Sequence, residues 1–117
     1  MRKLLSLAAL FALLSGCASY APGDDQKGIE LQATGSQVLV ALRNYMDQNA
    51  RPPRTLKDLV PKFIPALPDE PQINYDLRAS RLEFTYKQEG SQGSEVACHA
   101  VVGETEWICT GIYQQRQ

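Results

Sequence analysis

Hydrophobic residues first cluster near the start of the chain, in a run from Leu4 to Leu14 whose one polar member is Ser6. Arg2 and Lys3 precede this run. It is too short for a membrane-spanning helix, which needs about 20 apolar residues. A basic start followed by a short apolar core is typical of a signal peptide, which is absent from the mature protein.

The next apolar positions recur at helical spacing over residues 28–50. The stripe that they form consists of Leu31, Val38, Leu39, Val40, Leu42, Tyr45 and Met46. Residues three and four apart share one helix face, so this spacing predicts an amphipathic helix. Gly35 and Ser36 weaken the pattern, which is clearest over 36–50. The helix should end before Pro52, because the residue preceding a proline disfavours helical backbone angles.

A second, shorter helix is predicted over residues 55–64. Thr55 can cap its first turn, and Asp58 stands three residues later, where a capping box has its acidic partner. The stripe expected to be buried consists of Leu56, Leu59, Val60 and Phe63. Pro61 leaves two alternatives open: it lies within the first turns, or it splits the segment into one turn and a bend. Extended chain is expected through the prolines that follow, Pro65, Pro68 and Pro71.

Strand patterns fill the rest of the chain. The clearest is Leu82–Tyr86, where apolar and polar residues alternate so that Leu82, Phe84 and Tyr86 share one face. The predicted strands are 73–77, 82–86, 96–102 and 106–113, separated by turn-forming residues at 88–94 and at Gly103-Glu104. Together with the preceding helix they predict an α+β fold, with an N-terminal helix packed on a four-stranded antiparallel sheet.

Cys98 and Cys109 are placed to pair across the last hairpin. If Gly103 and Glu104 are central in the turn, the two cysteines lie directly opposite each other. A four-residue loop, 102–105, makes them a pair without backbone hydrogen bonds, whose side chains are closer. A two-residue loop gives the wider pair, which suits a disulfide less well. We expect the longer loop and a disulfide; the alternative is two free buried thiols.

The cysteine face of this hairpin is expected to be the core side of the sheet. The residues predicted to share it are Val96, Ala100, Trp107 and Tyr113.

The third cysteine closes the sequence Leu14-Ser15-Gly16-Cys17, directly after the apolar run. This sequence resembles the bacterial lipoprotein signal, in which an aliphatic residue and two small residues precede a cysteine. The chain is cleaved before that cysteine, and its thiol is acylated. The resemblance implies lipidation of Cys17, and Ala18 after it implies release to the outer membrane. The alternative is an ordinary secretory signal, for which residues 18–21 offer a second cleavage site.

Cleavage before Cys17 divides the chain into three parts. Residues 1–16 are the expected signal peptide, 17–27 the lipidated cysteine with a flexible polar tether, and 28–117 one folded domain. The whole chain has 12 basic and 13 acidic residues, and the signal peptide removes two of the basic ones. No basic stripe remains that would attract nucleic acid, and no Lys/Arg cluster indicates binding to an anionic membrane surface.

The centre of the chain carries a longer pattern: Tyr45, Pro52-Pro53, then 55–64 (TLKDLVPKFI) and 67–71 (LPDEP). It resembles the globular part of type IV pilins and type II secretion pseudopilins. The resemblance covers roughly 42–75 and implies a helix laid on an antiparallel sheet, with a late disulfide.

Two features depart from that family. Pilins begin with a long apolar helix, where this chain has a lipobox, so filament packing is not expected. Some pseudopilins also have late calcium-binding aspartates, and no aspartate follows Asp76 here.

No catalytic pattern is present in the sequence, and no cofactor or metal is expected. His99 is the only histidine and is predicted to lie at the surface, opposite the cysteine face. Asp24-Asp25 and Asp69-Glu70 are expected to be solvated. The aromatic residues of the strands are expected in the core.

We therefore expect a non-catalytic periplasmic lipoprotein that serves as a docking or assembly factor for an envelope machine, related to secretion or pili. Its expected partners are the membrane, through the lipid, and an envelope protein. The alternative is a small ligand-binding or inhibitor lipoprotein of the cell envelope.

Overall fold

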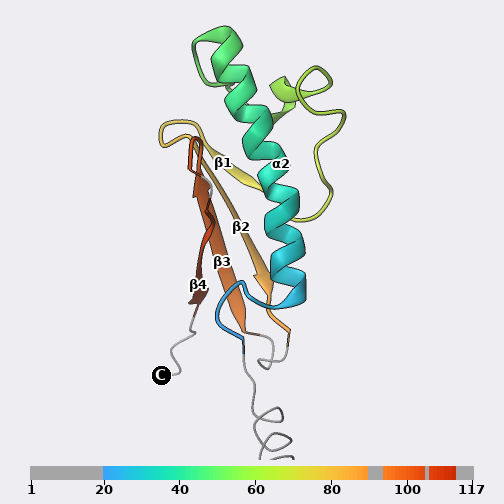
Figure 1. The fold of residues 1–117 in the computed structure, drawn as a ribbon, viewed down its shortest axis with the longest axis vertical. Helices are drawn as coiled ribbons and strands as arrows, with labels where there is room; N and C mark the ends of the chain where they lie inside the picture. The colour runs from blue at the N-terminus through green and yellow to red at the C-terminus, as the bar shows by residue number, and fades with distance from the viewer. Residues whose placement is uncertain (1–19, 90–93, 105, 113–117) are drawn as a thin grey trace, which may run out of the picture.

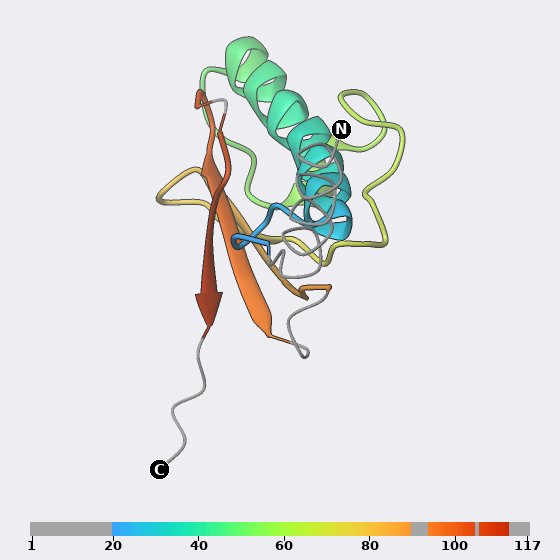
Figure 2. The same ribbon diagram turned by 60° about the horizontal axis from the view of Figure 1, so that its bottom comes forward.

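The computed structural model describes residues 20–89, 94–104 and 106–112. A single long helix, α2, lies along one face of a four-stranded antiparallel sheet (Figure 1). In the turned view the helix stays on that side of the sheet (Figure 2). The predicted α+β architecture is confirmed. In the described part of the chain, no helix is long and apolar enough to cross a bilayer.

Helix α2 spans Gln26–Asn49 and therefore begins two residues before the predicted start. It continues through Gly35, where the absence of a side chain leaves room for the Trp107 ring. The face toward the sheet buries Leu31, Val38, Leu39, Ala41 and Leu42. At the other end, Ala50 takes a left-handed conformation with φ of 58°, and its N–H donates to the Met46 carbonyl oxygen. This is a common way to end a helix.

The predicted second helix over 55–64 is wrong in length, because only one 3-10 turn forms, η1 at Leu56–Leu59. Of the stripe expected to be buried, Leu59 is fully buried, but Val60 is exposed because the helix does not continue to it. The capping box of Thr55 and Asp58 is confirmed. Its acidic half is well defined: Asp58 Oδ2 accepts hydrogen bonds from the backbone N–H of Arg54 at 3.1 Å and of Thr55 at 3.3 Å. Of the two alternatives for Pro61, the structure adopts one turn followed by a bend, since proline cannot continue the helical hydrogen bonds.

The sheet is a meander with the order β1-β2-β3-β4. Its strands are β1 at Asn74–Asp76, β2 at Arg81–Lys87, β3 at Glu95–Val101 and β4 at Ile108–Ile112. Every pairing is antiparallel, and Phe84 of β2 stands opposite Cys98 of β3. Strand β4 begins two residues later than predicted, so Trp107 belongs to the connection and not to the strand.

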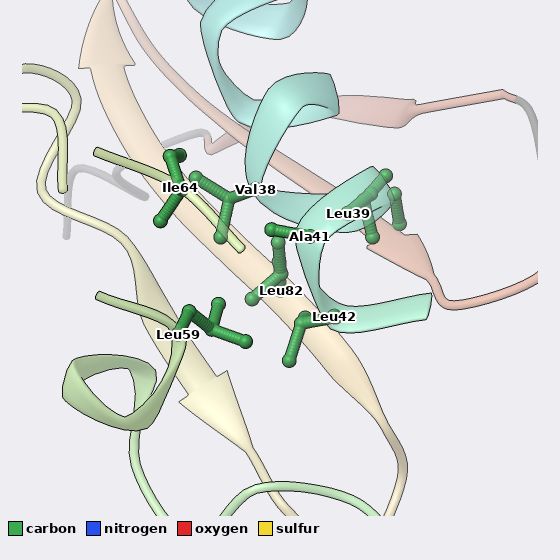
Figure 3. Close-up of a cluster of buried hydrophobic side chains, with 8 residues drawn as sticks. Val38, Leu39, Ala41, Leu42, Leu59, Ile64 and Leu82 are labelled. Carbon is green, nitrogen blue, oxygen red and sulfur yellow. The ribbon is translucent and has the colours of Figure 1, made fainter. Parts of the chain in front are cut away.

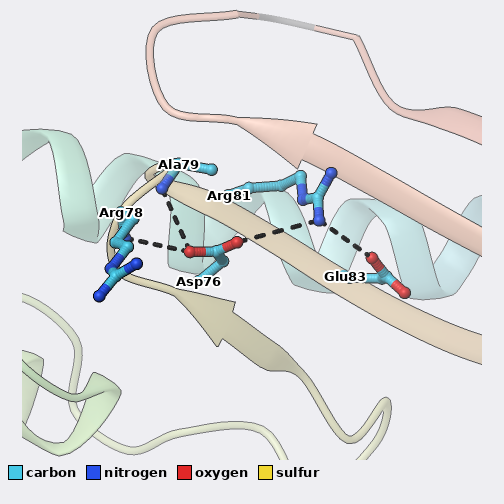
Figure 4. Close-up of polar contacts among 5 residues, drawn as sticks. All are labelled: Asp76, Arg78, Ala79, Arg81 and Glu83. Atoms are coloured by element: carbon cyan, nitrogen blue, oxygen red, sulfur yellow. Dashed lines mark hydrogen bonds and ion pairs between the residues drawn. The ribbon is translucent and has the colours of Figure 1, made fainter.

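The short turn between β1 and β2 is organised by one carboxylate. Asp76 Oδ1 accepts hydrogen bonds from the backbone N–H of Arg78 at 3.0 Å and of Ala79 at 3.2 Å. The Arg81 guanidinium lies 3.9 Å from Asp76 and 3.8 Å from Glu83 (Figure 4). These ion pairs are exposed and add little stability, so the contribution of Asp76 is to fix the turn geometry.

The core lies between α2 and the sheet. Val38, Ala41 and Leu42 of the helix face Leu82 of β2, and Leu59 closes the same cluster from the 3-10 turn (Figure 3). A second cluster, nearer the start of the helix, contains Leu31, Phe84, Tyr86, Val96 and Cys98. Because Val96, Cys98 and Ala100 are all buried, the prediction that the cysteine face is the core side is confirmed.

Candidate functional site

The segment that follows the predicted lipidation site is folded onto the end of the sheet. Two glutamine side chains hold it. Gln88 accepts a hydrogen bond from the Gly23 N–H at 3.0 Å and donates to the Tyr20 carbonyl oxygen at 3.0 Å. Gln32 donates to the Gly23 carbonyl oxygen at 2.7 Å. The flexible tether expected over 17–27 therefore does not describe Tyr20 onward. We call residues Tyr20–Asp25 the N-terminal seat.

Asp25 is the centre of this seat and is fully buried. It stands at the N-cap position of α2, but its carboxylate turns away from the helix toward the sheet. The Tyr86 hydroxyl donates to Oδ1 at 2.5 Å, and the Glu89 backbone N–H donates to Oδ2 at 3.1 Å. The expectation that Asp25 is solvated is wrong. Its partners lie more than sixty positions later in the chain, so local sequence gives no sign of them.

The Tyr86 phenol is held in its protonated form. Burial raises its pKa above the usual value of 10.0, and the hydrogen bond to Asp25 raises it further. Ionising this phenol would place a second negative charge beside a buried carboxylate, which is unfavourable in a poorly solvated site. Tyr86 therefore remains a hydrogen-bond donor throughout the neutral range and keeps the seat attached to β2.

Gly28 lets the first turn of α2 approach this network. A Cβ at this position would collide with the Tyr86 hydroxyl, and it would lie 2.7 Å from both Asp25 Oδ1 and the Gly23 carbonyl oxygen. The last of these is backbone and cannot move without shifting the seat. Glycine is therefore required here by packing, although it weakens an isolated helix.

We expect Gly28→Ala to lower the free energy of unfolding by about 1–3 kcal/mol, because the added methyl overpacks the seat. Helix propensity alone would give the opposite sign, a gain of about 1 kcal/mol. Chemical denaturation of the purified chain distinguishes the two outcomes. In a Tyr86→Phe background the collision with the hydroxyl is absent, so the loss caused by Gly28→Ala should shrink. A stabilised Gly28→Ala variant would show that the close contact is not tight.

The predicted disulfide joins Cys98 of β3 to Cys109 of β4 and is confirmed. The two residues are direct partners in the sheet register, with Cα atoms 4.0 Å apart. This separation is close to that of the narrower antiparallel pair, as expected from the longer loop. The bridge also borders the seat, since a Cβ on Gly23 would lie 2.7 Å from Cys109 Sγ.

The other residues singled out from the sequence lie apart from the seat. His99 is half-buried on the far face of the sheet, with Glu83 and Ile108 as its neighbours in the register. Asp69 and Glu70 are exposed as expected, and Glu70 lies 3.8 Å from Lys27. Cys17 and Tyr113 lie outside the described residues.

Three aromatic side chains pack in the core, as expected. The Phe84 ring lies 5.2 Å from that of Trp107 and 6.2 Å from that of Tyr86, measured between centroids. The Trp107 indole N–H donates to Ser36 Oγ at 2.9 Å, which ties the β3–β4 connection to the middle of α2. These rings therefore join the two layers of the fold.

Over the described ranges, 20–89, 94–104 and 106–112, no three His, Cys, Asp or Glu side chains gather as metal ligands would. The arrangement of the seat is one that fixes geometry: a carboxylate, a phenol and an amide satisfy one another away from solvent. No family model, curated protein or solved structure matches this chain.

Proposed function

We propose that this chain is a non-catalytic periplasmic lipoprotein, anchored to the outer membrane through lipid on Cys17, and that its domain serves as a docking or assembly factor for an envelope machine. The lipobox supports the anchor. Support for a docking role comes from the N-terminal seat, because its first residue, Tyr20, stands three positions after Cys17 and is bound to Gln88. Three extended residues span at most about 10 Å. The lipid would thus hold the seat end of the domain close to the bilayer.

The orientation follows from where the seat lies. Tyr20–Asp25 packs where α2 begins, at the lower end of the molecule in Figure 1, and α2 ends at the upper end. An anchor at Cys17 would place the start of α2 beside the membrane and its end farthest into the periplasm. A docking factor benefits from this arrangement, since the end of the domain farthest from the anchor is left accessible to a partner.

We further propose that the domain is pilin-like. One helix laid on an antiparallel meander with a late disulfide supports this, together with the pattern at 55–71. In this proposal lipid replaces the apolar helix of a pilin, so the domain works beside an assembly and does not pack into it.

The ligand-binding alternative would be favoured by a concave pocket lined with the strand aromatics. Phe84, Tyr86 and Trp107 instead pack together in the core, which favours docking.

The anchor is tested by Cys17→Ser in the producing bacterium. We expect loss of metabolic labelling with palmitate, loss of globomycin-sensitive processing, and release of the protein from washed membranes. Stable attachment needs more than one acyl chain, so removal of the acylated thiol should abolish it. Ser19→Ala is the matched control and should remain labelled and membrane-bound. A Cys17→Ser protein that matures normally and stays on the membrane would contradict the proposal.

A further inference from the structure

An open groove of about 750 Å³ lies at the end of the molecule opposite the seat, where α2 ends and η1 begins. Its lining includes three basic side chains, Arg51, Arg54 and Lys57, and two exposed aliphatic ones, Val60 and Leu77. We call these five residues the basic groove. The chain as a whole is slightly acidic, with a net charge of -1, so this concentration of positive charge is local.

The three cations have no acidic partner within the part of the chain that the structure describes. Ion pairs there join Lys27 to Glu70 and Arg81 to Asp76 and Glu83. Asp58 is the one acidic residue of the lining, and its Oδ2 already accepts two backbone hydrogen bonds in the capping box. The lining therefore has three basic side chains against one acidic side chain, an excess of two positive charges.

The walls of the groove are fixed before any ligand arrives. Pro53 behind it is fully buried, and its carbonyl oxygen accepts a hydrogen bond from the Tyr75 hydroxyl at 2.8 Å. Leu59, the last residue of the 3-10 turn, is also fully buried. On the helix side, the Tyr45 ring packs edge-on against the Phe63 ring, with 5.3 Å between the ring centroids. These contacts hold the backbone behind the groove in place, which limits the conformational entropy lost on binding to that of the exposed side chains.

Aliphatic walls beside the cations limit the class of ligand. Val60 is 36% exposed and Leu77 is 40% exposed, so both offer apolar contact area that a simple inorganic anion would leave unused. An acidic peptide that also carries an apolar side chain matches both parts of the groove. Arginine in particular pairs with carboxylates through two parallel hydrogen bonds.

The position of the groove argues against a lipid headgroup as its ligand. Between Gln26 and Tyr45 the helix rises roughly 30 Å, at 1.5 Å per residue. If Cys17 is anchored as proposed, the distance between the basic groove and the bilayer is several times the Debye length of about 8 Å. The groove would then be directed toward proteins in the periplasm.

We propose that the basic groove binds an acidic peptide segment of a partner protein, with Arg51, Arg54 and Lys57 pairing its carboxylates and Val60 and Leu77 receiving an apolar side chain. This deepens the proposed docking role and rests on it for the choice of a protein over a membrane. The groove would be the surface that the anchored domain presents to its partner.

Fluorescence anisotropy with the detergent-solubilised full chain tests this proposal. The probe is a fluorescein-labelled peptide in which glutamates flank one leucine, and its reference carries glutamines in their place. We expect the acidic probe alone to bind, and its affinity to fall as salt rises. The triple variant Arg51→Gln, Arg54→Gln, Lys57→Gln should lose about tenfold or more in affinity, since each exposed pair contributes modestly.

A matched control separates the groove from overall charge. Lys27→Gln, Arg43→Gln and Lys87→Gln together remove the same charge from other surfaces, and this variant should bind the probe nearly as well as the unaltered chain. Equal losses in the two triple variants would overturn the proposal, because binding would then reflect net charge. Absence of any binding by the unaltered chain would overturn it as well.

Leu77→Ser distinguishes a peptide from a bare anion. It removes an exposed apolar contact and leaves the charge unchanged, and we expect it to weaken probe binding severalfold. Competition by inorganic phosphate with no effect of Leu77→Ser would overturn the peptide assignment in favour of an anion site. Groove-dependent binding to phosphatidylglycerol vesicles would overturn it in favour of a membrane. The probe assay is independent of anchoring, so its failure is distinct from a failure of the Cys17→Ser test.

Discussion

Replacing Asp25 with alanine is expected to lower the free energy of unfolding by about 3 kcal/mol, the largest effect of any single polar substitution proposed for this chain. The carboxylate is fully buried, and its two oxygens receive the Tyr86 hydroxyl and the Glu89 N–H. Alanine removes the acceptor of the Glu89 N–H and the closer of the two acceptors of the Tyr86 hydroxyl, and with them the link between Asp25 and β2. In a domain of this size the melting temperature should fall by roughly 10–20 °C.

Two further variants make the Asp25 result specific. Asp24 is adjacent and exposed, so Asp24→Ala should change stability by no more than about 0.5 kcal/mol. Asp25→Asn keeps the shape of the side chain but places an amide N–H₂ opposite one of the two donors. Its loss of stability should therefore fall between that of Asp24→Ala and that of Asp25→Ala. Thermal unfolding followed by near-ultraviolet circular dichroism measures all three. If Asp24→Ala and Asp25→Ala melt together, the buried network does not stabilise the domain.

Breaking the disulfide is expected to cost about 3 kcal/mol in the chain-entropy treatment of a loop this long. Cys98 and Cys109 are 11 positions apart, and the bridge restrains the unfolded chain by closing that loop. It also fastens β4, the edge strand at which Ile108 and Ile112 are 52% and 41% exposed. Cys98→Ala with Cys109→Ala should therefore loosen β4 first, which hydrogen exchange of its amides would detect.

Reduction provides the control for the disulfide variants. A reducing agent opens the bridge in the unaltered chain without removing either sulfur, so it isolates the effect of the covalent link from that of packing at Cys98. We expect reduction to reproduce most of the loss, and the double alanine variant to be insensitive to the reducing agent. A reduced chain that melts at the same temperature as the oxidised one would show that the bridge is structurally neutral.

Much of the fold follows from local sequence. Alternation at Leu82, Phe84 and Tyr86 identified the buried face of β2, and the spacing of Val38 and Leu42 identified that of α2. The hairpin symmetry about Gly103-Glu104 placed Cys98 opposite Cys109. In each case the physical cause lies within a few residues or across a single turn, because backbone periodicity and turn geometry are local properties.

The basic groove does not follow from the sequence pattern. Arg51, Arg54 and Lys57 are separated by two residues each, so they form no continuous basic run. The fold places their side chains along one groove with Val60. Leu77, the residue directly after β1, lines the same groove, and its place there depends on the tertiary fold.

Local sequence patterns were enough to predict one amphipathic helix, a meander and a cysteine pair, because each depends on residues close together in the chain. The N-terminal seat, in contrast, depends on contacts between distant parts of the chain. Asp25 appeared to belong to a polar tether, yet it is buried because Tyr86 and Glu89 supply donors from 61 and 64 positions away. A buried carboxylate is tolerated only where such partners exist, and partners that distant are fixed by chain packing and not by any local pattern.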